Sequence, residues 1–234
     1  VFGGNAAVPL DALLTPEGIC ELLNRSDSSI FFYDARYEKL IPLVKQNCPK
    51  VVKCVCINRS AGAENPNGDT ELSEILEKYS PEEPAPVSPD ALAAISYTSG
   101  TTGFPKGVML THYNILNNGQ TIGDGMKFTH EDRLCITVPF FHCFGMVLAL
   151  MSCISPGTPF VPIDMFNAKK VMDALVTKHC TAVHGVPTMF IAMLEHPDFD
   201  KYDFSHMRTG IMAGSPCPIK TMYDVSEKMN MHDI

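Results

Sequence analysis

Short β-rich runs alternate with amphipathic stretches of helical period along most of this chain. In its first part, residues 29–33 and 51–57 are predicted strands, and residues 36–46 and 70–79 are predicted helices. Parallel strands need long crossover connections, which are usually helices, so this rhythm indicates βαβ units around a mostly parallel sheet. With 234 residues, the chain is long enough to bury a large core of that kind.

A second series of the same type occupies the rest of the chain. It follows a strand predicted at 91–97, a loop rich in Gly, Thr and Ser, and a helix predicted from Thr111 to about Gly123. The remaining predicted strands are at 134–138, 158–163, 180–184 and 209–213, and the remaining helices are at 144–154, 168–178, 188–194 and 218–229.

These elements predict an α/β fold with two stacked, mostly parallel sheets and flanking helices. We place a first subdomain at 1–123 and a second at 134–234, with the break at 124–133. The prolines among residues 80–90 can neither continue a helix nor donate along a strand ladder, so that stretch is predicted to be a surface linker.

The negative charge is concentrated in one stretch. The net charge is −8, and the residues from Glu64 to Asp90 contain eight acids and one base, Lys78. A chain of this balance has no general attraction for nucleic acid or for an anionic lipid surface, so an anionic substrate needs a local binding site. The acidic stretch itself has two interpretations, a solvated connector or a surface for a basic partner.

The nine cysteines and the apolar runs bear on the compartment. The cysteines are odd in number, lie mostly in apolar runs and include no CxxC pair, which favours reduced, buried thiols over disulfides or a zinc site. The longest apolar stretch, 143–154, is too short to cross a membrane as a helix. The first residues show neither a signal nor a transit peptide, so we expect a cytoplasmic chain that begins in mid-protein.

One loop carries most of the chemical information. Residues 97–108 read YTSGTTGFPKGV, in which four Ser and Thr hydroxyls and three glycines surround Lys106. Glycines let the backbone approach a ligand, hydroxyls donate rotatable hydrogen bonds, and the lysine adds a positive charge, which together suit a polyphosphate. The Walker loop GxxxxGK[ST] is excluded because no glycine directly precedes Lys106. A Gly- and Thr-rich hairpin without a ligand is the alternative.

The same twelve residues closely resemble the phosphate-binding signature of the adenylate-forming enzymes, which include acyl-CoA synthetases, luciferases and the adenylation domains of peptide synthetases. The resemblance implies that the loop holds the β- and γ-phosphates of ATP, that Lys106 is catalytic, and that Thr98 lies near Mg²⁺. Donors and metal held in place stabilise the charge that develops when a carboxylate attacks the α-phosphate and expels pyrophosphate. The implied ATP contacts in this loop are Thr98, Ser99, Gly100, Thr101, Thr102, Gly103 and Lys106.

Three further segments resemble motifs of this superfamily. Residues 139–145, PFFHCFG, match a motif whose histidine, here His142, lies beside the ATP phosphates and the acyl entrance, which implies a catalytic role. Residues 185–188, GVPT, and 213–216, AGSP, match two turns, and the second of these borders adenine and the acyl pocket. Taken alone, a core histidine and ordinary strand-to-helix turns are the alternatives. The implied substrate contacts are Phe141, His142, Val186 and Gly214, and the implied further ATP contacts are Gly214, Ser215 and Pro216.

The segment 139–145 also bears on which acid is activated. Peptide-synthetase adenylation domains hold the substrate ammonium with an aspartate early in this stretch, whereas this chain has Phe140 and Phe141 there and no carboxylate. A buried ammonium without a counter-charge is costly, so an apolar acid is favoured. The run from Pro139 to Asn230 is most similar to bacterial and mitochondrial medium-chain fatty acyl-CoA synthetases. Methionines close to these motifs line an apolar tunnel or are ordinary core residues.

The resemblance therefore implies part of a fatty acyl-CoA synthetase. Such an enzyme uses ATP and Mg²⁺ to convert a fatty acid to an acyl-adenylate, releases pyrophosphate and transfers the acyl group to CoA. Because members are much longer than this chain, we expect an incomplete αβαβα-type large domain, without the barrel subdomain and the C-terminal domain, that is inactive alone. The expected partners are the fatty acid, ATP and CoA, with no nucleic acid and no integral membrane segment, and the resemblance allows a homodimer.

Two other functions stay open. An adenylating enzyme that uses another acceptor, an acyl-carrier protein or an amine, fits the same motifs, because the resemblance implies that the acceptor is bound by regions outside this chain. A truncated fragment that binds nucleotide without catalysis also fits, because a truncated product keeps the intact loop from Thr98 to Lys106.

Overall fold

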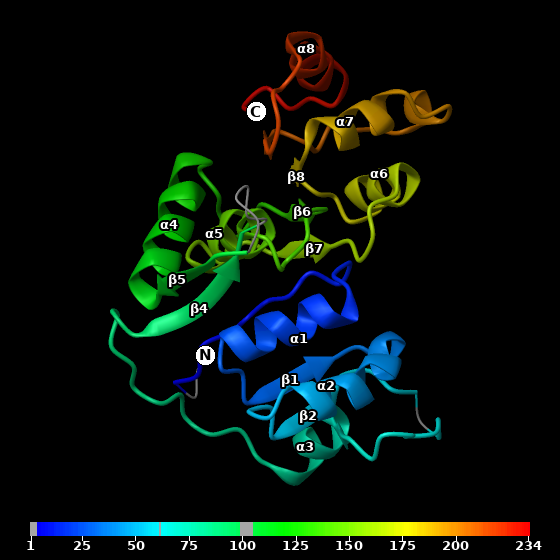
Figure 1. Ribbon diagram of the computed structural model, residues 1–234. Coiled ribbons are helices and arrows are strands. Elements are labelled where there is room, and N and C mark those ends of the chain that lie inside the picture. The colour runs from blue at the N-terminus through cyan, green and yellow to red at the C-terminus, as the bar shows by residue number, and fades with distance from the viewer. Residues whose placement is uncertain (1–3, 61, 99–104) are drawn as a thin grey trace. The chain divides into compact units, whose positions relative to one another are not determined.

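Parallel strands and the helices between them build two compact units, Val1–Leu110 and Thr111–Ile234 (Figure 1). The computed structural model describes residues 4–60, 62–98 and 105–234. The predicted α/β class, with parallel sheets and flanking helices, is confirmed.

The first unit is built around a three-stranded parallel sheet with the order β1-β2-β3. Alternate side chains of a strand point to opposite faces, and Tyr33, Cys54 and Cys56 point into one buried cluster with residues of the neighbouring helices. A separate pair of strands, β4 and β5, follows. The strands of this unit are β1 (Ile30–Tyr33), β2 (Lys53–Cys56), β3 (Thr70–Glu71), β4 (Leu92–Tyr97) and β5 (Gly107–Thr111).

Caps and prolines in the sequence set where the helices of this unit begin. The Thr15 hydroxyl accepts the N–H of Gly18 at 3.1 Å, and Pro16 fills the first helical position, where no N–H is needed. The helix predicted at 36–46 is instead two elements, because α2 starts anew with Pro42 in its first turn. The helices are α1 (Pro16–Arg25), the 3-10 helix η1 (Ala35–Leu40), α2 (Ile41–Asn47) and α3 (Leu72–Lys78).

A buried arginine ties together the carboxyl ends of these strands. Arg59 exposes 6% of its side chain, donates from Nε to Glu71 at 2.6 Å and pairs with Glu38 through a terminal nitrogen. Its other terminal nitrogen donates to the hydroxyl of Tyr33 at 3.2 Å, and that hydroxyl donates to Asp69 at 2.8 Å. Burial and the hydrogen bond to the Asp69 carboxylate raise the pKa of Tyr33. The network therefore links η1, β1 and β3 through one guanidinium.

The second unit is built around four parallel strands in the order β7-β6-β8-β9. Both faces of this sheet are covered, so its strands are apolar on both sides. In β6, Leu134 and Ile136 belong to one buried cluster and Cys135 to another, and Ala182 and Val183 of β8 divide in the same way. The strands are β6 (Leu134–Ile136), β7 (Phe160–Pro162), β8 (Ala182–Gly185) and β9 (Thr209–Met212).

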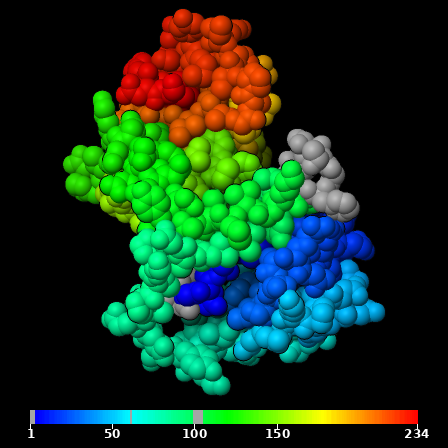
Figure 2. All heavy atoms as spheres, turned by 60° about the vertical axis from the view of Figure 1, so that its left-hand side comes forward, coloured from blue at the N-terminus to red at the C-terminus, as the bar shows by residue number. Residues whose placement is uncertain are grey.

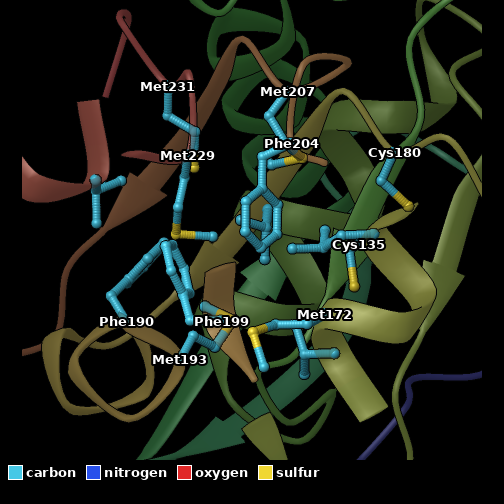
Figure 3. Packing of buried hydrophobic residues seen from close by; sticks show 14 of the residues in the cluster. Cys135, Met172, Cys180, Phe190, Met193, Phe199, Phe204, Met207, Met229 and Met231 are labelled. Carbon is cyan, nitrogen blue, oxygen red and sulfur yellow. The ribbon is translucent and has the colours of Figure 1, made fainter. Parts of the chain in front are cut away.

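Methionine and phenylalanine side chains fill one face of this sheet (Figure 3). Phe190 and Met193 of α7 pack there with Met172 of α6, and all three are almost fully buried. Met193 and Met212, for which the sequence left a tunnel or a core role open, are core residues. In the space-filling view, α8 and the chain that follows it, in orange and red, lie together on the surface (Figure 2). The helices are α6 (Ala168–Thr177), α7 (Pro187–Leu194), the 3-10 helix η3 (Phe199–Lys201) and α8 (Ile219–Lys228).

Helix α4 (His112–Gly125) packs against the helices that follow β6, as Figure 1 shows for α5. A Cβ at Gly119 would lie 2.9 Å from the backbone of Met151, and one at Gly123 would lie 2.6 Å from the carbonyl of Ser152. The two glycines thus permit a close backbone approach. This contact makes α4 part of the second unit, so the break falls before α4 instead of at the predicted 124–133. The helix predicted at 144–154 is the π-helix η2 (Phe144–Met151) followed by α5 (Ser152–Ile154).

All nine cysteines lie among the described residues, and none of them forms a disulfide. Seven are buried, whereas Cys143 is exposed and Cys217 is half-buried. In the described ranges, no helix has the length and apolar character needed to cross a membrane.

Candidate active site

The described ends of the Gly- and Thr-rich loop lie side by side. Thr98 directly follows β4 and Lys106 directly precedes β5, and the N–H of Thr98 donates to the carbonyl of Lys106 at 3.0 Å. Both residues are exposed. The hydrogen bond therefore presents one hydroxyl and one ammonium at the base of a single loop. The predicted contacts Ser99, Gly100, Thr101, Thr102 and Gly103 lie outside the described residues.

Gly107 allows β5 to pack closely against β4. A Cβ at Gly107 would lie 2.9 Å from Cγ2 of Ile95 and 3.3 Å from the ring of Tyr97. Both of those residues belong to β4, so a side chain at Gly107 would push the two strands apart. This glycine thus serves strand packing, and Lys106 remains the charged group of the loop.

The other predicted residues gather at one edge of the sheet in the second unit. Residues 137–143, 186 and 213–216 directly follow β6, β8 and β9, which are neighbours in the sheet. The carboxyl ends of parallel strands meet at one edge, and ligands of open α/β sheets bind outside that edge. His142, Gly214, Ser215 and Pro216 are exposed there, and Phe141 and Val186 are half-buried.

Val186 and Gly214 bring two of these segments into contact. The N–H of Ala213 donates to the carbonyl of Gly185 at 3.2 Å, which extends the ladder between β8 and β9 by one step. Gly214 has a φ of +91°, and a Cβ there would lie 3.2 Å from Cγ1 of Val186. Glycine is needed for that backbone conformation, and it keeps the turn close to Val186.

His142 is held in one orientation by its own loop. Its Nδ1 accepts the N–H of Phe144 at 3.1 Å, so the neutral ring carries its proton on Nε2. The carbonyl of His142 accepts the N–H groups of Gly145 and Met146, both at 3.0 Å. The ring is exposed, which overturns the alternative of a core histidine. A proton donor at Nε2 therefore faces solvent from this edge.

The opposite edge of the same sheet is closed by an ion pair. Arg208 donates to both carboxylate oxygens of Asp132 at 2.8 Å, and Thr181 donates to Asp132 at 2.7 Å. Burial alone raises the pKa of Asp132, but these donors outweigh it and hold the pKa below its usual range. The paired charges fasten the amino ends of the strands, whereas the predicted residues occupy the edge that is open.

His184 was not among the predicted residues. It lies in β8, is fully buried, and in the described part of the chain neither ring nitrogen has a hydrogen-bond partner. Each such unsatisfied group costs about 1–3 kcal/mol. Burial lowers the pKa of His184 to about 4, with the backbone of Val183 and Leu148 opposing part of the shift. Its only sequence signal was a polar residue inside an apolar strand.

The lowered pKa of His184 predicts a loss of stability in mild acid. In the unfolded chain His184 is protonated below about pH 6.5, whereas in the folded chain it stays neutral down to about pH 4. The free energy of unfolding therefore falls as the pH decreases across this interval. We expect a loss of about 2 kcal/mol at pH 5 relative to pH 7.5. Urea unfolding at both pH values measures it, and the difference should shrink in His184→Leu but persist when the exposed His130 is replaced by Leu.

The described residues contain no group of three or more His, Cys, Asp or Glu side chains placed to hold a metal ion. Thr98, the predicted Mg²⁺ neighbour, is an exposed hydroxyl, which suits a metal held mainly by the phosphates of its nucleotide. The predicted site residues thus form two sets, Thr98 and Lys106 in the first unit, and the carboxyl-edge residues in the second.

Comparison with known families decides the relationship. Residues 2–234, nearly the whole chain, match the family described as AMP-binding enzyme. The chain belongs to this family. Over 145 residues, 62% of this chain, it is 56% identical to the candidate acyl-CoA synthetase YngI of Bacillus subtilis (strain 168), of which it covers 26%. Over 146 residues, 60% of this chain, it is 41% identical to the human mitochondrial medium-chain acyl-CoA ligase ACSF2, of which it covers 24%.

Solved structures of the family share the fold. The crystal structure of ATP-bound MatB from Rhodopseudomonas palustris matches 97% of this chain with a TM-score of 0.80 and 25% identity, over 43% of that protein. The chain spans about a quarter of the length of its two curated relatives. It therefore belongs to the AMP-binding family, is similar to acyl-CoA synthetases and ligases within it, and aligns with only part of those relatives.

Proposed function

We propose that this chain forms part of an enzyme that activates a medium-chain fatty acid with ATP and Mg²⁺ and transfers the acyl group to CoA. The observation that carries the proposal is the carboxyl edge of the second sheet, where His142, Val186 and Gly214 follow three neighbouring strands. Lys106 and Thr98, at the closed base of the Gly- and Thr-rich loop, supply the donors for a polyphosphate.

Each group has a role that its chemistry supports. Lys106 and Thr98 bind the β- and γ-phosphates and stabilise the charge on the departing pyrophosphate. His142, with its proton on Nε2, donates to a phosphate or carboxylate oxygen at the carboxyl edge. Gly214, Ser215 and Pro216 border the nucleotide, and Phe141 and Val186 give the acyl chain an apolar contact. ATP bound here supplies the adenylyl group, and Mg²⁺ neutralises its phosphates.

The apolar side chains favour a fatty acid over an amino acid. In the segment between β6 and η2, Phe140 is exposed, Phe141 is half-buried, and no carboxylate is present. A substrate ammonium would meet no counter-charge there. The name of ACSF2, a medium-chain acyl-CoA ligase, supports a medium chain length for the acid.

The test is acid-dependent ATP–pyrophosphate exchange in the longest reading frame that contains these residues. We expect exchange with medium-length fatty acids and a loss of about 100-fold in Lys106→Ala, because one donor to the developing charge is removed. Thr98→Ala should also lower the rate. Lys53→Ala, which removes an exposed lysine of β2 in the same unit, should leave it unchanged.

Three results would contradict all or part of the proposal. Exchange supported by amino acids and not by fatty acids would change the substrate class. No exchange with any acid, in a chain that still binds ATP, would leave a nucleotide-binding protein without adenylating activity. Acyl transfer to an acyl-carrier protein or an amine in place of CoA would keep the first half-reaction and correct the acceptor.

A further inference from the structure

His184 occupies a position that stability alone does not explain. Its imidazole is fully buried and lies near the rings of Phe128 and Phe144, at centroid distances of 6.4 and 6.0 Å, and both nitrogens lack a hydrogen-bond partner among the described residues. A leucine has nearly the same volume and no polar atom to leave unpaired. Buried polar groups without partners are rare in proteins, so each one calls for an explanation.

The neighbours of His184 lead to the open edge of the sheet. Phe144 is the first residue of the π-helix η2, and its ring is tilted by 33° against the imidazole. The N–H of the same residue donates to Nδ1 of His142. Phe144 therefore contacts His184 through its side chain and holds His142 through its backbone N–H.

The strand that carries His184 is held firmly on both sides. His184 lies opposite Ile136 of β6 and Ile211 of β9, and its carbonyl accepts the hydroxyl of Thr137 at 2.6 Å. Its ring thus projects from a fixed backbone at the centre of the sheet. By contrast, η2 is a π-helix, a geometry that is rare and occurs frequently at functional sites. A ring on a rigid strand is suited to set the position of the first turn of such a helix.

We propose that His184 is a positioning residue, which holds Phe144 so that its N–H keeps Nδ1 of His142 occupied and directs Nε2 toward the ligand edge. The catalytic consequence rests on the proposed function of His142. The positioning itself does not, because it is a property of the protein without any ligand.

Native-state amide exchange of the 234-residue chain, followed by NMR, tests the positioning. In His184→Leu, the Phe144 N–H should exchange about three- to tenfold faster, as expected when one hydrogen bond is weakened. The trans-hydrogen-bond coupling between the Phe144 nitrogen and Nδ1 of His142 should weaken at the same time. Global stability should stay the same or rise, since Leu removes two unpaired nitrogens, and a purely structural role would not produce this combination.

Phe128→Leu is the matched control, because the Phe128 ring also stacks with His184 whereas His142 accepts its backbone hydrogen bond from Phe144. It should lower global stability and leave the local exchange of Phe144 and the coupling unchanged. The proposal is overturned if His184→Leu leaves Phe144 exchange within twofold of the wild type, or if Phe128→Leu accelerates it equally. The amide-exchange and coupling measurements need no ATP or acid. A negative result in them is therefore distinct from a negative result in the ATP–pyrophosphate exchange assay.

Discussion

Arg59→Met should destabilise the first unit by about 1.5–3 kcal/mol, because it removes a 6%-exposed guanidinium that hydrogen-bonds the partly exposed Glu38 and Glu71 carboxylates. The guanidinium lies between Glu38 and Glu71 and also donates to Tyr33. Met matches much of its length, so the loss comes from two carboxylates left without a cation and not from a large cavity. At a typical domain stability of about 5–15 kcal/mol, this loss would remove a large part of the stability of the unit.

Urea unfolding followed by circular dichroism, together with peptide-resolved hydrogen exchange, measures this effect. Exchange should rise in β1, β2 and η1 and stay unchanged in the second unit. The matched control is Lys50→Met, since Lys50 pairs with Asp27 on the surface of the same unit with 60% of its side chain exposed. A pair of that kind contributes about 0.2–1 kcal/mol. An equal loss in the free energy of unfolding in the two variants would show that the Arg59 network stabilises the unit no more than a surface ion pair does.

Gly145→Ala should cost about 3 kcal/mol or more and disorganise the loop that carries His142. A Cβ at Gly145 would lie 2.2 Å from the carbonyl oxygen of Pro139 and 2.9 Å from that of Val138. Both contacts are with backbone, so no side-chain rotation relieves them, and the cost lies at the upper end for overpacked sites. The segment would have to move away from η2, which weakens the bond between Phe144 and His142.

Gly125→Ala is the appropriate comparison for this substitution. Gly125 is the last residue of α4, its φ is not positive, and a Cβ there meets no atom within 4 Å. Alanine should be neutral or stabilise by about 0.5–1 kcal/mol. Thermal unfolding of both variants, with the Phe144 amide as a local probe, separates the two cases. If Gly145→Ala melted like the wild type with an unchanged Phe144 amide, the close approach of Pro139 would not be a real constraint.

Hydrophobic period and turn residues were sufficient to predict most of the fold. Each predicted strand overlaps an observed one, because an apolar run between helices has little alternative to the centre of a parallel sheet. Helix α1 was also missed, although Thr15 and Pro16 signal its start locally, whereas the missed strands β5 and β3 depend on tertiary contacts. β5 begins at Gly107, whose fit against Ile95 cannot be read locally, and β3 exists because Thr70 and Glu71 pair with β2. Pro42 indicates that a new helix begins near Ile41, but the continuous helical pattern of residues 36–46 led to the prediction of a single helix.

The candidate site was predicted unevenly for a similar reason. His142, Val186 and Gly214 lie in motifs with recognisable spacing, and the structure groups them at one edge. His184 has no motif of its own, and its importance depends on Phe144, which is far from it in sequence. The domain break was misplaced because Gly119 and Gly123 carry no sign in the sequence of the backbone that approaches them.

The sulfur content of the core in the second unit ties its integrity to oxidation chemistry. Six of the fifteen buried residues in the cluster of Figure 3 are methionines, namely Met172, Met193, Met207, Met212, Met229 and Met231. A sulfoxide would place a polar oxygen where the packing has no donor for it. The folded sheet shields these sulfurs from peroxide, so damage reaches them when the chain opens. Each oxidation then hinders refolding, and a brief unfolding under oxidative conditions becomes a lasting one unless a reductase restores the thioether.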